Sequence, residues 1–97
     1  MKKPDLPPLR PGRTNAFKRD LDRCRRRDYD MNVARVVMGR QIHREVLEAA
    51  YNDHPLKGEW LGHRECHLEP DWLFIYRIDG DEITFERTGT HSDLFDE

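Results

Sequence analysis

Residues 60–90 read WLGHRECHLEPDWLFIYRIDGDEITFERTGT, and this stretch decides the fold. Its first segment, WLGHRECHL, and its last, EITFERTGT, alternate between apolar and polar residues, as strands with one buried face do. The middle segment, DWLFIYRI, is an apolar run with mild alternation. Asp79-Gly80-Asp81 is a strong hairpin-turn signal, and Glu69-Pro70 ends the first segment. The pattern therefore predicts a three-stranded antiparallel meander.

Upstream of this stretch the apolar residues recur at helical spacing. Thr14 or Asn15 can cap a first helix that runs through residues 16–27. Its narrow apolar stripe consists of Phe17, Leu21 and Cys24.

Asp30 can cap a second helix through residues 31–51. Because the link between the two helices is short, we expect them to pack as an antiparallel hairpin. The residues of the second helix expected to face inward are Val33, Val36, Val37, Ile42, Val46, Leu47 and Ala50.

The first thirteen residues are rich in proline, which fixes φ and cannot donate a ladder hydrogen bond. This segment is therefore an extended arm or a short edge strand. Ninety-seven residues suffice for one domain. We predict an α+β domain over 1–97, with a Pro-rich arm or edge strand (1–13), a helical hairpin (14–51) and the meander (52–97). The hairpin would cover one face of a small antiparallel sheet. The prolines are Pro4, Pro7, Pro8 and Pro11.

No apolar run is long enough to cross a bilayer, and the N-terminus does not resemble a signal peptide. Cys24 and Cys66 lack the spacing of a disulfide framework or a CxxC motif. We therefore expect a cytoplasmic protein with reduced thiols and no membrane association.

The charges are divided unevenly along the chain, although the net charge is only −2. Residues 1–44 hold thirteen Lys and Arg against five Asp and Glu, whereas residues 45–97 hold four against fourteen. The basic half can provide a footprint for phosphates. It is equally compatible with a solvated pair of Arg-rich helices.

Several residues suited to acid–base and phosphate chemistry lie at the strand ends that a meander places at one edge of its sheet. These are His67, Asp71, Arg87 and His91. Imidazoles can move protons near neutral pH, and a guanidinium can stabilise extra negative charge on a phosphate. The set is therefore suited to cleaving RNA through its own 2′-hydroxyl, with no metal and no other cofactor. A hydrogen-bonded sheet edge without catalytic function would use the same residues.

Residues 53–95 strongly resemble the YafQ branch of the RelE superfamily of type II toxins. The matching motifs are DHPLKG (53–58), CHLEPDW (66–72) and RTGTHSDLF (87–95). The resemblance implies a ribosome-associated mRNA endonuclease that is neutralised by a small antitoxin. We expect that antitoxin to carry an acidic segment which folds on the toxin.

The resemblance also assigns roles to residues. Catalytic roles fall on His54, His67, Asp71, Arg87 and His91, whereas Trp72 and Phe95 match positions that shape the site or stack on a base. His54 or Asp71 is expected to be the general base, His91 or His67 the general acid, and Arg87 the group that stabilises the transition state. From their charge and position, the further RNA-binding candidates are Lys57, Arg19, Arg23 and Arg26.

Three features depart from the family pattern. They are the proline-rich start, the acidic net charge and His63, which we expect to lie on the surface. The alternative functions are a non-enzymatic ParE-like toxin that binds a protein such as gyrase, a zinc module, and a DNA-binding regulator. The zinc module would use His63, His67, Cys66 and His91, but Cys66 and His67 should point to opposite faces of a strand.

Overall fold

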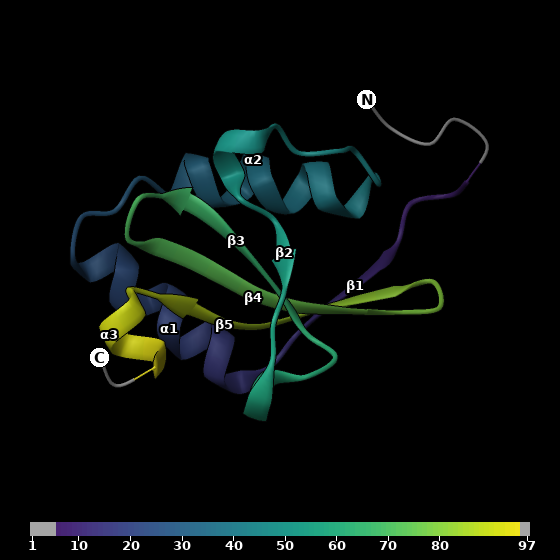
Figure 1. Ribbon diagram of the computed structural model, residues 1–97. Helices are drawn as coiled ribbons and strands as arrows, with labels where there is room; N and C mark the ends of the chain where they lie inside the picture. The colour runs from purple at the N-terminus through teal and green to yellow at the C-terminus, as the bar shows by residue number, and fades with distance from the viewer. Residues whose placement is uncertain (1–5, 96–97) are drawn as a thin grey trace.

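The computed structural model describes residues 6–95 and contains a five-stranded sheet (Figure 1). The strand order is β1-β5-β4-β3-β2. The predicted meander is confirmed, since β3, β4 and β5 are consecutive antiparallel neighbours. Its hairpin turn places Gly80 at φ 60°, which glycine adopts without strain. The strands are β1 (Arg10–Arg13), β2 (His54–Pro55), β3 (Arg64–Glu69), β4 (Trp72–Asp79) and β5 (Glu82–Gly89).

The proline-rich segment contributes the edge strand β1, which runs parallel to β5. The Arg10 amide donates to the Asp81 carbonyl at 2.7 Å, and the Thr14 amide donates to the Phe85 carbonyl at 3.1 Å. Pro11 is tolerated because it lies in an edge strand. The sheet is consequently mixed, with one parallel pair added to the expected antiparallel strands. Pro4 lies outside the described residues.

Helix α1 (Asn15–Arg26) begins where the sequence predicts. The Thr14 hydroxyl is the cap and accepts the Phe17 amide hydrogen bond at 2.9 Å. The buried residues of α1 are Phe17, Asp20 and Cys24, so a carboxylate lies on the side that faces the sheet.

Helix α2 (Met31–Ile42) is capped by Asp30 as predicted, but the expected extension to residue 51 is wrong. Arg44 takes a positive φ of 60°, which ends the helix, and the Ile42 carbonyl accepts a hydrogen bond from the Leu9 amide at 2.8 Å. The N-terminal segment thus occupies the place where another helical turn would continue. A short 3-10 helix, η1 (Ala49–Tyr51), follows.

Three of the residues expected to face inward from the second helix are instead exposed, namely Val36, Val46 and Ala50. The buried face of α2 consists of Ala34, Val37 and Gln41. Val36 points away from that face, whereas the other two lie beyond the end of the helix.

The helices α1 and α2 cover one face of the sheet, where the rings of Phe17, Phe74 and Phe85 lie within 5.7 Å of one another. On the other face, Leu73, Ile75 and Leu94 form a smaller apolar cluster. Helix α3 (His91–Phe95) follows β5 and lies beside α1 (Figure 1). None of the helices between residues 6 and 95 is long and apolar enough to cross a membrane.

A β-bulge in β5 determines which side chains reach each face. Ile75 is opposite Arg87, but the next residue, Tyr76, is opposite Phe85, so Glu86 is the extra residue. Phe85 packs under the helices, whereas Arg87 shares the face of its partner Ile75. Without the bulge, Phe85 and Arg87 would point to the same side.

Candidate active site

Three imidazoles meet at one edge of the face that α1 and α2 leave free. His54 comes from β2, His67 from β3, and His91 is the first residue of α3. The ring centroids of His54 and His67 are 6.4 Å apart, and those of His67 and His91 are 5.5 Å apart. Residues separated by as many as 37 positions in the sequence are therefore close enough to act on one phosphodiester.

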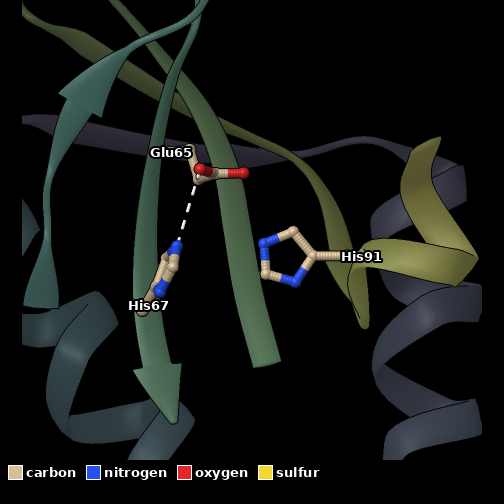
Figure 2. A group of neighbouring side chains, drawn as sticks. All are labelled: Glu65, His67 and His91. Atoms are coloured by element: carbon tan, nitrogen blue, oxygen red, sulfur yellow. Dashed lines mark ion pairs between the residues drawn. The ribbon is translucent and has the colours of Figure 1, made fainter. Parts of the chain in front are cut away.

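Glu65 lies between these histidines and is not among the residues predicted from the sequence. Its side chain is 7% exposed, with Oε2 at 3.0 Å from His54 Nε2 and 3.6 Å from His67 Nε2. Figure 2 shows the Glu65 carboxylate facing the space between His67 and His91. The sequence could have indicated Glu65 as a site residue, because it lies two residues before His67 and must share the same face of the strand.

His54 has acceptor atoms at both ring nitrogens. Its Nδ1 is 2.6 Å from the Asn52 carbonyl, and its Nε2 faces Glu65. The imidazolium form, which has a proton on each nitrogen, satisfies both contacts. The neighbouring Asp53 is anchored by the Tyr76 hydroxyl at 2.6 Å, which fixes the backbone on which His54 sits.

His91 is held by Asp71 at the opposite side of the group. Its Nδ1 is 2.7 Å from Asp71 Oδ1, and its backbone N–H donates to the same oxygen at 2.9 Å. These two hydrogen bonds lower the pKa of Asp71 from its usual value. The His91 ring points from α3 toward Glu65 and His67 (Figure 2), so its Nε2 is available to exchange a proton.

Arg87 borders an open groove of about 490 Å³ that also includes Lys57, Trp60 and Phe95. Its guanidinium turns toward α1, where Nε donates to Asp20 Oδ2 at 2.6 Å. This hydrogen bond raises the pKa of Arg87 above its already high usual value, so Arg87 stays cationic. The groove is connected to the histidines through Phe95, whose ring is 6.3 Å from that of His91.

Trp72 shapes the site from inside and does not stack on RNA, which corrects its selection as a base-binding residue. It is 2% exposed, its Nε1 donates to Thr88 Oγ1 at 2.9 Å, and its ring packs on Tyr29. The Trp72 ring therefore has no face free for a base.

The cations predicted to bind RNA differ in how exposed they are and in whether they already form an ion pair. Arg19 and Lys57 are exposed. Arg26 is exposed but pairs with Asp22 at 2.6 Å, and Arg23 is partly buried between Asp20 and Asp93. Arg23 is therefore in large part a structural residue.

His63 is half-buried, contrary to the expectation of a surface residue. Its ring packs edge-on against Trp60 at 5.2 Å, and its Nε2 is 3.7 Å from Glu86 Oε2. Cys66 points into the core, where burial raises the pKa of its thiol to about 12. These positions are incompatible with a zinc site that combines His63 and Cys66 with His67.

Glu65, His67 and His91 could hold a metal ion without any cysteine. One ligand atom from each lies within 4.8 Å of the others, and a carboxylate with two imidazoles is a set that binds zinc or copper. Two of the histidines selected as catalytic candidates, His67 and His91, could thus also be metal ligands.

Comparison with known proteins gives one family. Residues 9–96 match the family model "Bacterial toxin of type II toxin-antitoxin system, YafQ". The mRNA interferase toxin YafQ of Escherichia coli K12 is 42% identical over 80 residues, which are 81% of this chain and 87% of that protein.

Two solved structures extend the similarity to the fold. The toxin in the crystal structure of the E. coli DinJ-YafQ complex has a TM-score of 0.84 and 39% identity, covering 90% of this chain and 98% of that one. A metal-bound toxin from Helicobacter pylori has a TM-score of 0.84 and 35% identity, covering 90% and 99%.

Proposed function

This chain belongs to the YafQ family of type II toxins and is an mRNA interferase, and we propose that it cleaves ribosome-bound mRNA by histidine acid–base catalysis. The observation that carries the mechanism is the group of His54, His67 and His91 around the buried Glu65. The alternative of a non-enzymatic toxin that binds gyrase is not favoured, because the two E. coli relatives are named mRNA interferases and the full set of histidines is present.

In the proposed reaction the 2′-oxygen of the RNA attacks the adjacent phosphorus, and the bond from phosphorus to the 5′-oxygen breaks. One residue accepts the 2′-hydroxyl proton and another protonates the leaving 5′-oxygen, so that a 2′,3′-cyclic phosphate forms. The RNA supplies the nucleophile, and Arg87 stabilises the charge that develops on the phosphate oxygens. No step requires a metal.

The contacts favour a different assignment of the base and the acid from the one expected above. Asp71 is committed to His91, so the general base is His91, which accepts the proton through Nε2. His54, whose nitrogens both face acceptors, is the general acid. His67 lies between them and binds the phosphate.

The assignment is tested by the pH dependence of the cleavage rate. A general base must be unprotonated and a general acid protonated, so the wild-type profile is expected to be bell-shaped. His91→Ala should remove the dependence on the acidic side, and His54→Ala the dependence on the alkaline side. The opposite pair of results would exchange the two roles, and a wild-type rate in both variants would exclude the site.

The biological setting of the reaction is also a proposal. The E. coli relative is found in complex with DinJ, and a cognate antitoxin is expected to bind this chain in the same way, in the cytoplasm. Induced expression without the antitoxin, followed by primer extension on an abundant mRNA, should show in-frame cuts that are missing with His91→Ala. Growth arrest without cuts would contradict the ribonuclease function.

A further inference from the structure

Asp20 of α1 is a buried carboxylate next to the proposed catalytic face. Its side chain is 6% exposed, and it lies three residues after Phe17 and four before Cys24, on the side of the helix that faces the sheet. An ionised carboxylate in such a place loses its hydration, and hydrogen bonds must replace it. The partners of Asp20 therefore indicate its role.

Three of its four hydrogen bonds come from the end of β5. Oδ2 accepts from Arg87 Nε at 2.6 Å and from the Thr88 amide at 3.1 Å, while Oδ1 accepts from Arg87 Nη2 at 3.2 Å. The fourth comes from Arg23 Nη2 at 3.2 Å. The bidentate contact with Asp20 fixes the plane of the Arg87 guanidinium and leaves its Nη1 to bind a ligand.

Arg87 borders two open grooves from this fixed position. One, of about 370 Å³, lies along α1 and includes Arg19, Arg23 and Arg26. The other is the groove that includes Lys57 and Phe95. An RNA strand that passes Arg87 would therefore meet a guanidinium already oriented before it binds.

We propose that Asp20 is a positioning residue, which holds Arg87 in the orientation that stabilises the transition state of RNA cleavage. This inference rests on the proposed function and deepens it. A stabilising role alone explains the contact less well, since buried ion pairs often contribute little net stability compared with apolar residues. A flexible arginine without Asp20 would lose its alignment, and misplacement by about 1 Å can cost roughly a hundredfold in rate.

The test is a double-mutant cycle with Asp20→Asn and Arg87→Ala, measured as single-turnover cleavage of mRNA on programmed ribosomes. Asp20→Asn keeps an acceptor oxygen and should lower the maximal rate constant about tenfold to hundredfold, with little change in the half-saturating concentration. Added to Arg87→Ala, it should cause no further loss, because it acts only through Arg87. Asp22→Asn, on the same helix but paired with Arg25 and Arg26, should leave the rate unchanged.

An equal loss from Asp20→Asn with and without Arg87 would show a structural role and overturn the proposal, as would a wild-type rate in Asp20→Asn. Arg87→Lys examines the same contact without altering α1. It keeps the charge but lacks the planar fork, so a loss of at least about tenfold is expected, and a full rate would also overturn the proposal. If Arg87→Ala cleaved like wild type, the function proposed for Arg87 would fail instead.

Discussion

Glu65 has the most constrained chemistry of any single residue at the site. It is buried, it lies within 3.6 Å of two imidazoles, and its β4 partner Ile75 is apolar. Its Oε2 is placed to accept a hydrogen bond from an N–H of either imidazole. In the proposed mechanism it therefore orients the imidazole that protonates the leaving group.

We expect Glu65→Gln to lower the rate of RNA cleavage about tenfold to hundredfold, because His54 loses the carboxylate that orients its ring. The exposed Glu69→Gln, at the end of the same strand, is the matched control and should retain the wild-type rate. Thermal unfolding of both variants would show whether any loss comes from unfolding. A wild-type rate in Glu65→Gln would contradict this role.

The same residue underlies a prediction about metal ions. If zinc or copper binds Glu65, His67 and His91, cleavage should be inhibited, because an imidazole that coordinates a metal has no lone pair for a proton. Titration of the metal against both the rate and the bound stoichiometry tests this, and His67→Ala should weaken binding. An activity that EDTA abolishes and metal restores would instead show that metal takes part in the reaction.

At the scale of elements, α3 is held to α1 by charged contacts. Asp93 accepts from Arg27 at 2.8 Å and from the Thr90 amide at 3.0 Å, and the hydrogen bond from Arg27 is the main reason that the pKa of Asp93 is strongly lowered. Gly89, at φ 154°, permits this approach, because a Cβ there would lie 2.8 Å from Asp93 Oδ2. These contacts therefore hold α3, the helix that carries His91, against the end of α1.

Asp93→Asn should destabilise the fold by about 1 to 2 kcal/mol near pH 7. The folded-state pKa of Asp93 is lowered, so its contribution is present above the ordinary value of about 4 and is lost as the pH falls through the folded value. Chemical denaturation at pH 7 and at pH 3 checks this, with the exposed Asp79→Asn as control. A difference from wild type that stays constant or grows toward acid would contradict it.

At the scale of the whole molecule, the fold pairs the basic half of the chain with the acidic half. Arg10 binds Asp81, Arg27 binds Asp93, and Arg40 binds Glu48. Part of the basic charge is therefore neutralised by ion pairs within the chain, and the cations left for RNA are fewer than the sequence indicates.

Arg19 and Lys57 are exposed cations that border the two grooves beside Arg87. We expect Arg19→Ala and Lys57→Ala to raise the half-saturating concentration of programmed ribosomes several-fold, with the maximal rate nearly unchanged, because they bind phosphate without touching the reacting atoms. Lys18→Ala, exposed on α1 but outside both grooves, is the control. A fall in the maximal rate alone would indicate that Arg19 and Lys57 act on the reacting atoms.

Local sequence determined the types of the elements and most of the proposed site. Alternation, the Asp79-Gly80-Asp81 turn and the caps at Thr14 and Asp30 act between neighbouring residues, so they can be recognised without the fold. The histidine set followed from strand order and from family resemblance.

Tertiary structure alone decided where α2 ends and which predicted site residues are accessible, because contacts between distant residues control both. Helix α2 ends at Ile42 because Leu9 docks there, and Trp72 is unavailable to RNA because Tyr29 and Thr88 enclose it. A bulge in β5 takes Arg87 off the core face, and its guanidinium still reaches Asp20 of α1 through a 2.6 Å hydrogen bond. Such long-range packing leaves no periodic trace in the sequence, because it depends on which residues the fold brings together.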